Sequence, residues 1–226
     1  MKLVIGNKNY SSWSLRPWLL MQQLGIAFEE EKLSFNDPAF SRRVHHLSPA
    51  GRVPILIDGE LVIWDSLAIV EYLAEVFPDR GVWPRERPAR ARARSIVAEM
   101  HAGFPNLRSA LSMNCELTLA KFPLTREVRR EVQRILGMWT ECRATFGAAG
   151  PFLFGAFSAA DAYYAPVVRR FVSYDVALPV VARDYVQAIE ALPSMKLWMV
   201  AALAEHDYVD RDETYRDPPG SPAPGV

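Results

Sequence analysis

Residues 9–25 read NYSSWSLRPWLLMQQLG and join a predicted strand, a hydroxyl-rich turn and a predicted helix. Residues 3–5 precede this segment as a short apolar run that is typical of a buried strand. From Leu15 onward the apolar residues follow helical spacing, and Gly25 supplies a natural stop. A helix that starts directly after a turn carries free N–H groups and the positive end of its dipole, so this segment predicts a place that favours an anion.

Pro17 sets the expected start of this helix, because a residue without an N–H is best tolerated in the first turn. We therefore expect Ser14 to be the N-cap. Tyr10, Ser11 and Ser12 then lie in the loop just ahead of the helix, where a hydroxyl can donate to an anion. Taken alone, any one of these serines is more often a turn or cap residue than a ligand.

The composition is that of a folded chain without a charge-driven partner. The 226 residues are 50% apolar, which is enough for one large domain or two smaller ones. Lysine plus arginine (26) balance aspartate plus glutamate (26), so neither nucleic acid nor an anionic membrane surface is expected as a partner. No apolar run approaches the roughly 18 residues that span a bilayer, and Cys115 and Cys142 lack metal-like or CxxC spacing. We therefore expect a reduced, cytoplasmic protein without a membrane segment.

The first 80 residues predict a compact α/β unit. Three more strands are expected at residues 28–33, 53–57 and 61–64, and two more helices at residues 39–47 and 66–77. Asp58 and Gly59 separate the last two strands and are a strong hairpin signal, so those strands are predicted to be antiparallel. The unit is thus expected to be a mixed sheet covered by helices.

Everything beyond an expected linker at residues 81–87 is helical in character. Apolar stripes at helical spacing occur at residues 96–111, 128–139, 163–171, 181–192 and 197–203. Pro105 lies inside the first stripe and is expected to kink it. The expected domains are therefore residues 1–80 and 88–210, followed by a Pro-rich, disordered tail at residues 211–226.

Four short segments in a fixed order resemble the cytosolic glutathione S-transferases. They are SSWSLRPWLL at residues 11–20, RVPIL at 52–56, DSLAIVEYL at 65–73 and FSAAD at 157–161. The resemblance covers residues 1 to about 210. It implies a thioredoxin-like α/β first domain, with a mixed four-stranded sheet and helices, followed by an all-α second domain. The serine-rich loop is most similar to that of the zeta class, with Trp13 in place of the motif cysteine. Without that thiol, the mixed-disulfide chemistry of cysteine-using members is not expected.

The resemblance implies that glutathione is the co-substrate and that a loop hydroxyl stabilises its thiolate. A thiol of this kind has a pKa of about 8.5, so the protein must lower it. A hydrogen bond to the charged form contributes roughly 1.5 to 3 kcal/mol and each pKa unit about 1.4, so one donor beside a helix N-terminus can supply the shift. By the family match the donor is Ser11, with Ser12 as the alternative. Tyr10 is expected to pack at the edge of the loop, although other classes use a tyrosine.

The hairpin and the helix start that follows it are implied to hold the tripeptide. Pro54 is expected to be cis, so that Val53 pairs with the cysteinyl backbone like an added strand. A trans proline that opens an edge strand is the alternative. Asp65 and Ser66 are expected to hold the γ-glutamyl amino group and carboxylate, although a plain N-cap fits the same residues. Arg52 is expected beside the glycine carboxylate.

The pocket for the electrophile is expected between the two domains, with Trp13, His101 and Phe104 in its lining. Aromatic residues at helical spacing are more often core residues than ligands. Ser158 and Asp161 also match the family, but they predict a capping box that stabilises a buried helix. No metal is expected, because no suitable ligand set is present.

The sequence therefore predicts a glutathione transferase that directs the thiolate at a small, apolar electrophile. A glutathione-dependent cis–trans isomerase of the zeta type would use the same thiolate. A non-catalytic glutathione-binding or dimerisation module could keep the same fold. Members of the family form homodimers, so the resemblance implies a homodimer here.

Overall fold

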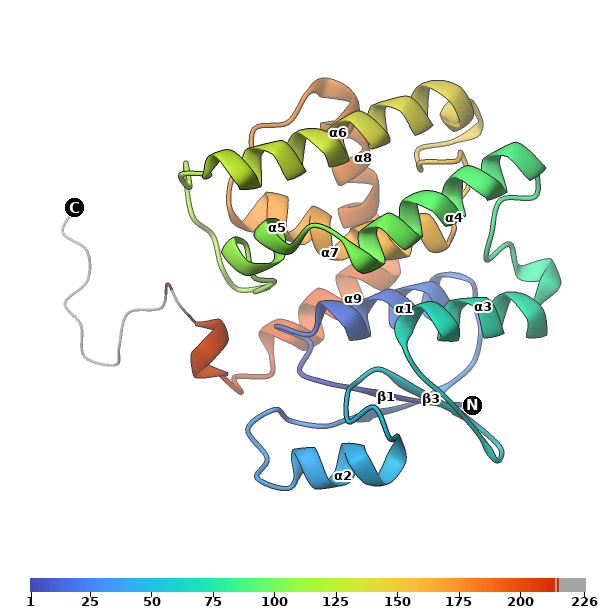
Figure 1. The fold of residues 1–226 in the computed structure, drawn as a ribbon, viewed down its shortest axis with the longest axis vertical. Coiled ribbons are helices and arrows are strands. Elements are labelled where there is room, and N and C mark those ends of the chain that lie inside the picture. Colours follow the sequence, from blue (N-terminus) through green and yellow to red (C-terminus); the bar gives the residue numbers. More distant parts are fainter. Residues whose placement is uncertain (214, 216–226) are drawn as a thin grey trace.

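The computed structural model describes residues 1–213 and 215. An N-terminal unit that contains a sheet lies against a C-terminal unit made of helices (Figure 1). This confirms the predicted fold class. Most of the predicted disordered tail, residues 214 and 216–226, lies outside the described residues. Within the described part, none of the helices combines the length and the apolar character needed to span a bilayer.

Four strands form one mixed sheet in the order β2-β1-β3-β4. They are β1 (Lys2–Ile5), β2 (Glu29–Lys32), β3 (Ile55–Asp58) and β4 (Leu61–Ile63). β1 pairs with β2 in parallel and with β3 in antiparallel register. β3 and β4 are antiparallel and flank the predicted hairpin turn, where Gly59 has a positive φ of 59°.

Helices cover both faces of this sheet. They are α1 (Ser12–Gln23), α2 (Phe40–Leu47) and α3 (Ser66–Val76). α1 and α3 lie on the face toward the C-terminal unit, and α2 lies on the opposite face (Figure 1). The alternation of side chains along β1 accounts for this, because Leu3 and Ile5 belong to the larger core whereas Val4 packs with Val44 of α2.

The C-terminal unit is built around one buried helix. Its helices are α4 (Arg87–Ala102), α5 (Pro105–Ala110), α6 (Arg126–Phe146), α7 (Ala159–Ser173), α8 (Val180–Ala191) and α9 (Pro193–Leu203). Short 3₁₀ turns follow α3, α6 and the C-terminal end of α9, at η1 (Pro78–Arg80), η2 (Gly147–Ala149) and η3 (Asp210–Asp212). α7 is buried along nearly its whole length and packs against α1 and α4, so it joins the two units.

The start of α1 differs from the prediction. Ser11, and not Ser14, is the N-cap, because its Oγ accepts a hydrogen bond from Ser14 N at 3.4 Å. Pro17 therefore lies in the second turn of the helix. The backbone hydrogen bond that Pro17 cannot make is outweighed by packing of the apolar side of α1, where Leu15 and Leu19 are fully buried.

The apolar stripe at residues 96–111 was predicted to form a helix kinked at Pro105, but it forms two separate helices. α4 ends at Ala102, and α5 starts at Pro105 as a separate helix. Phe104 between them has a left-handed backbone, with φ of 61°. Arg108 of α5 closes the break, because its guanidinium donates to the carbonyl oxygens of Met100 and Gly103 at the end of α4.

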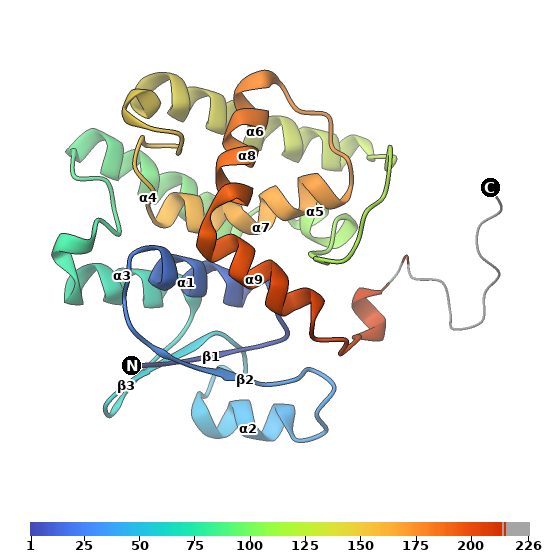
Figure 2. The same ribbon diagram turned by 180° about the vertical axis from the view of Figure 1, so that it is seen from behind.

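After α9 the chain returns to the N-terminal unit as a strap, residues 204–213 (Figure 2). The Glu205 carboxylate accepts hydrogen bonds from the backbone N–H groups of Lys8, at 2.7 Å, and Asn9, at 3.2 Å. Tyr10 OH donates to Glu213 at the other end of the strap. The strap therefore fixes the loop that leads into α1.

Candidate functional site

Two adjoining cavities, each of about 370 Å³, meet at the start of α1. The serine cavity is lined by the loop before α1, by the hairpin side and by the strap, and includes Tyr10, Ser11, Ser12, Arg52, Val53 and Arg211. The α3 cavity is lined by the start of α3 and the end of α4, and includes Trp13, Val53, Pro54, Asp65, Ser66 and His101. Trp13, Arg52 and Val53 line both. Segments that are distant in sequence thus converge on one space.

The hydroxyl of Ser11 is engaged in the cap of α1. Its Oγ lies 2.7 Å from Ser14 Oγ, to which it donates, and it accepts from Ser14 N. Ser14 Oγ also accepts from Gly6 N at 3.1 Å, which ties the end of β1 to the start of α1. Ser14 carries a proton of its own, so the direction of the Ser11–Ser14 bond can reverse when an acceptor enters the serine cavity. Ser11 is 6% exposed.

The hydroxyl of Ser12 has a different partner. Its Oγ accepts a hydrogen bond of 3.2 Å from Arg170 Nη2 of α7. Arg170 is buried and donates further to the carbonyl oxygens of Leu111 and Arg108. The C-terminal unit therefore contacts the serine loop directly through a cation.

Val53 and Pro54 occupy the position that the resemblance implies. The Val53–Pro54 peptide bond is cis, which confirms that expectation. Val53 precedes the paired register of β1 and β3, which begins at Ile55, and lines both cavities. The backbone of Val53 lies outside the ladder between β1 and β3. It borders the two cavities, where an extended ligand could pair with it.

At the start of α3, Asp65 has two roles. Its Oδ1 caps the helix by accepting from Leu67 N at 2.9 Å. Its Oδ2 lies 3.1 Å from His101 Nε2 at the end of α4. Burial lowers the pKa of His101 below its usual value, with Asp65 acting in the opposite direction, so the imidazole is neutral at neutral pH and donates Nε2–H to the carboxylate. This contact links the two units across the α3 cavity.

Ser66, the first residue of α3, is fully buried, and its hydroxyl lies 3.0 Å from Tyr163 OH of α7. Leu67 N and Ala68 N of the first turn already donate to Asp65 Oδ1, so the Ser66 hydroxyl and the positive end of the α3 dipole are what is placed to meet an anion in the α3 cavity. The sequence prediction that Asp65 and Ser66 share one helix start is confirmed, while their ligand roles stay predictions.

Three buried or half-buried guanidinium groups surround Trp13 and the serine loop. Arg16 stacks between Trp13 and Tyr163, with its Cζ 4.0 Å and 4.7 Å from the two ring centroids. Arg108 lies 4.7 Å from the Trp13 centroid, and Arg170 is the partner of Ser12. Burial lowers the pKa of Arg16 to about 9, so it stays charged at neutral pH. Its Nε and Nη1 have no hydrogen-bond partner among the described residues.

Sequence reasoning missed this arginine cluster, which we define as Arg16, Arg108 and Arg170. Arg16 lies within residues 9–25, and its position next to the serine loop was the one feature of the sequence that pointed to the cluster. The other two residues come from α5 and α7, and only the packing of these helices against α1 brings them to the loop.

Some predicted residues lie elsewhere. Phe104 is 6% exposed and belongs to the core, so it lines neither of these cavities, in contrast to Trp13 and His101. Tyr10 does pack at the loop edge, with its hydroxyl donating to Glu213. Among residues 1–213 and 215, no group of three His, Cys, Asp or Glu side chains is placed to hold a metal ion.

Neither cysteine can replace the motif thiol. Cys115 and Cys142 are buried and unpaired, and burial raises their pKa to about 12 and about 11. A thiol with such a pKa is protonated and unreactive at neutral pH. Cys142 lies in α6, whereas Cys115 lies in the irregular segment after α5, where its backbone N–H bonds to Asn9.

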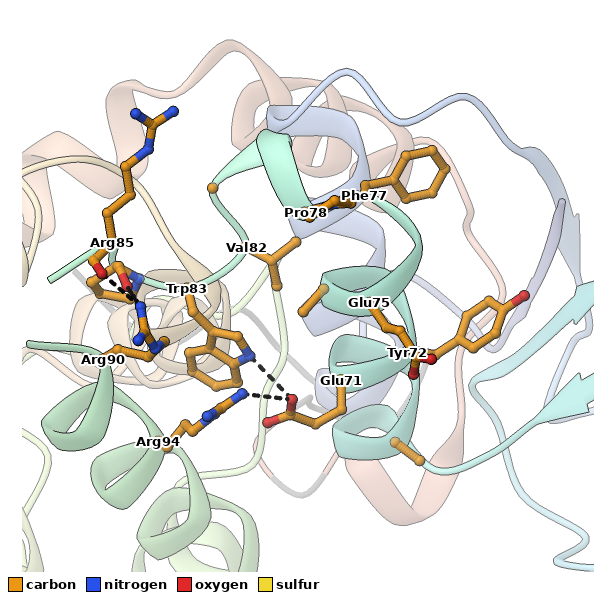
Figure 3. Close-up of a pocket in the computed structure, with 14 residues that line it drawn as sticks. Glu71, Tyr72, Glu75, Phe77, Pro78, Val82, Trp83, Arg85, Arg90 and Arg94 are labelled. Atoms are coloured by element: carbon orange, nitrogen blue, oxygen red, sulfur yellow. Dashed lines mark hydrogen bonds and ion pairs between the residues drawn. The ribbon is translucent and has the colours of Figure 1, made fainter. Parts of the chain in front are cut away.

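A larger cavity of about 720 Å³ lies away from this site, between α3 and the segment that leads into α4 (Figure 3). Its centre is an interaction in which the Glu71 carboxylate accepts from Trp83 Nε1 and from Arg94, each at 3.3 Å. None of the predicted site residues lines it.

Two family profiles match the chain. The profile described as "Glutathione S-transferase, N-terminal domain" matches residues 10–76, and "Glutathione S-transferase, C-terminal domain" matches residues 122–201. The first match includes the serine loop, Val53 and the start of α3, and the second includes α6, α7 and α8.

The chain is also similar to individual known proteins. The chain is 28% identical to a stringent starvation protein A homolog from Haemophilus ducreyi, over 67% of this chain and 66% of that protein, which is just under two thirds of its length. It is 32% identical to a probable maleylacetoacetate isomerase from Vibrio cholerae, over 58% of this chain and 62% of that protein. A glutathione transferase homolog from Burkholderia gl BGR1, solved with bound glutathione, superposes with a TM-score of 0.69 over 89% of this chain and 97% of that one. At 22% identity this last likeness shows the fold alone.

Proposed function

Because the chain belongs to the glutathione S-transferase superfamily, we propose that it binds glutathione in the two adjoining cavities and stabilises its thiolate for attack on a small, apolar electrophile. The observation that carries this proposal is the position of Val53. It lines both cavities, with the serine loop on one side and the start of α3 on the other. An extended tripeptide that pairs with Val53 would reach both helix starts at once.

Each end of the tripeptide has a partner in this arrangement. The γ-glutamyl carboxylate meets the first turn of α3 and the Ser66 hydroxyl, and its amino group meets Asp65. The glycine carboxylate meets Arg52, which lines both cavities. The cysteinyl sulfur then lies at the start of α1, beside Ser11 and Ser12.

The start of α1 suits a sulfur anion. Its first turn contains no acidic residue, so the positive end of the helix dipole is not offset there. A hydroxyl of the Ser11–Ser12 pair donates to the thiolate, which favours the charged form and lowers the thiol pKa. Trp13 takes the place of a loop cysteine, so the reaction proceeds through the glutathione thiolate and not through a protein thiol.

The electrophile lies on the side of Trp13 and His101, whose rings are in edge-to-face contact with centroids 5.3 Å apart. Their apolar surface at the α3 cavity suits a small, uncharged substrate. We further propose that the protein acts as a homodimer in the cytoplasm, where its two unpaired cysteines stay reduced.

A second candidate is a glutathione-dependent cis–trans isomerase of the zeta type. The named isomerase among the relatives favours it, and so does the thiolate site, which both reactions share. In that case the thiolate adds to a double bond and is released after rotation, so glutathione is not consumed. Glutathione consumption therefore separates the two reactions.

Retention on immobilised glutathione, followed by activity assays, tests the proposal. We expect the wild type to be retained and to conjugate glutathione to members of a panel of small electrophiles. The double variant Ser11→Ala/Ser12→Ala should be retained but lose about 10- to 100-fold in rate, which corresponds to one charge-assisted hydrogen bond. Ser95→Ala, on the exposed side of α4, is the matched control and should keep full activity.

The other outcomes are equally informative. Turnover of a maleyl-type substrate without loss of glutathione would favour the isomerase. Retention without any turnover would favour a glutathione-binding module in which Ser11 serves only as the cap of α1. No retention would contradict the glutathione site and the roles of Val53, Asp65 and Ser66.

A further inference from the structure

The two serines of the loop differ in what their hydroxyl protons do. The Ser11 hydroxyl donates to Ser14 Oγ at 2.7 Å, so its proton reaches the serine cavity only if the direction of this bond reverses. The Ser12 hydroxyl accepts from Arg170 at 3.2 Å. An arginine can only donate, so this contact occupies a lone pair of Ser12 and leaves its proton to another acceptor. No acceptor for that proton occurs among the described residues, and Ser12 lines the serine cavity.

Arg170 is a buried cation that forms no hydrogen bond to a carboxylate within the described part of the chain. Its side-chain hydrogen bonds go to the carbonyl oxygens of Leu111 and Arg108 and to Ser12 Oγ. Asp212, which lines the serine cavity, acts on it through space. The neighbouring Arg169 differs, because its guanidinium forms an ion pair with Glu190 of α8. Of these two adjacent arginines on α7, only Arg170 directs its charge at the serine loop.

We propose that Ser12 donates the hydrogen bond that stabilises the glutathione thiolate, and that Arg170 is the positioning residue that turns the Ser12 proton into the serine cavity. This inference rests on the proposed glutathione site and names the donor within it. The thiol proton leaves to water, and Ser12 keeps its own proton throughout. Ser11 then serves as the cap that holds the loop in place.

The other two members of the arginine cluster reinforce this arrangement. Arg16 and Arg108 lie against Trp13, one residue further along the chain from Ser12. The buried pair Arg16 and Arg170 stays protonated at neutral pH, with pKa values lowered by burial to about 9 and about 10. A hydroxyl that accepts from a cation becomes a better donor to an anion, because the two hydrogen bonds polarise each other.

The pKa of the bound glutathione thiol tests the assignment of Ser12. It can be followed by titrating the ultraviolet absorption of the thiolate in the saturated complex. Replacement Ser12→Ala should raise this pKa by about one unit, equivalent to about 1.4 kcal/mol, and Ser12→Thr should restore most of the shift because it keeps the hydroxyl. Ser11→Ala should raise the thiol pKa less than Ser12→Ala does. A rise in Ser11→Ala that equals or exceeds that in Ser12→Ala overturns the proposal.

A second comparison tests the positioning role of Arg170. Arg170→Gln should raise the thiol pKa, whereas Arg169→Gln, the matched control on the same helix, should lower stability without moving the thiol pKa. Ser12→Ala/Arg170→Gln should raise the pKa by less than the sum of the two single changes, because both act through one hydrogen bond. Additive shifts, or an unchanged thiol pKa in a folded Arg170→Gln protein, overturn the positioning role. If Arg170→Gln does not fold, Arg170→Lys tests the same point, since lysine keeps the charge but shortens the donor.

Failure of this inference is distinguishable from failure of the proposed function. A wild-type protein that does not bind glutathione overturns both. Binding of glutathione with a lowered thiol pKa that Ser12→Ala leaves unchanged overturns only the assignment of Ser12.

Discussion

The starts of α1 and α7 are built from similar residues, but one opens onto a cavity and the other is closed by the protein's own polar groups. Each begins with a serine N-cap, at Ser11 and at Ser158. At α7 the polar groups are satisfied within the protein, because the Asp161 carboxylate accepts from Ser158 N at 2.9 Å and from Leu153 N at 3.0 Å, and Ala159 N donates to Val82 O at 2.8 Å. At α1 no acidic residue occupies the first turn, and the loop opens onto the serine cavity.

One local motif can therefore serve folding in one place and ligand binding in another. A helix start whose N–H groups are satisfied by acceptors of the protein itself has nothing left for a ligand, so the capping box of α7 stabilises the fold. A helix start without a carboxylate, and with guanidinium groups behind it, favours an external anion.

Removing the carboxylate of α7 should have the largest effect on stability. Asp161→Ala leaves Leu153 N, Ser158 N and the Ser158 hydroxyl without their acceptor in a fully buried site. We expect the free energy of unfolding to fall by about 3 kcal/mol, measured by denaturant titration. Asp184→Ala, at an exposed position on α8, should change it by less than about 0.5 kcal/mol. Equal losses in the two variants would show that the capping box is not a stability determinant.

The Asp161 carboxylate should also make the free energy of unfolding depend on pH. Burial raises the pKa of Asp161 to about 6, above the value of about 3.9 in an unfolded chain. The folded state therefore holds this proton more tightly. The contribution of Asp161 to stability is complete below about pH 4 and falls by about 2 to 3 kcal/mol as the pH rises to about 6. The stability of the wild type relative to Asp161→Asn, measured across this range, should decline with rising pH. A flat or rising difference would contradict the sign.

The start of α3 shares features with both helix starts. Asp65 caps it, as a carboxylate does at α7, and Ser66 borders a cavity, as the serine loop does at α1. Ser66→Ala removes one hydrogen bond to a bound carboxylate. We expect the dissociation constant of glutathione to rise about 30-fold, or about 2 kcal/mol, by isothermal titration calorimetry. Tyr163→Phe keeps Ser66 and removes only its hydroxyl partner, so it should weaken binding by less than about threefold. An unchanged affinity in Ser66→Ala would place the γ-glutamyl group elsewhere.

The smallest expected effect concerns the two caps themselves. Ser11→Ala and Ser158→Ala each remove a serine cap and should each lower the free energy of unfolding by about 1 kcal/mol. Saturating glutathione should enlarge the loss in Ser11→Ala, because that variant also disturbs the ligand site, but leave the loss in Ser158→Ala unchanged. Thermal unfolding with and without glutathione measures this. An identical ligand effect on both variants would remove the distinction between the two helix starts.

Local signals made most of the fold predictable. The Asp58–Gly59 turn and the pair Ser158 and Asp161 each act through neighbours in sequence, and the structure has a hairpin and a capping box at those places. The start of α1 was mispredicted because Pro17 was given more weight than tertiary packing, which holds a proline in the second turn. A proline constrains its own turn, but the neighbours of the helix decide whether that constraint ends it.

The site was predictable only in part. The serine loop, Val53 and Ser66 could be named from short motifs, since each lies in a segment that resembles the family. The arginine cluster could not, because Arg16, Arg108 and Arg170 come from three helices and meet only through packing. Phe104 shows the converse error, in which an aromatic residue near the pocket in sequence belongs to the core.

The function proposed for this chain depends on the start of α1 stabilising a sulfur anion. The most direct measurement is the thiol pKa of glutathione in its saturated complex with the wild-type protein, from the pH dependence of thiolate absorption. We expect a value at least about one unit below the 8.5 or so of a free thiol. A bound thiol that still titrates at about 8.5 would contradict it.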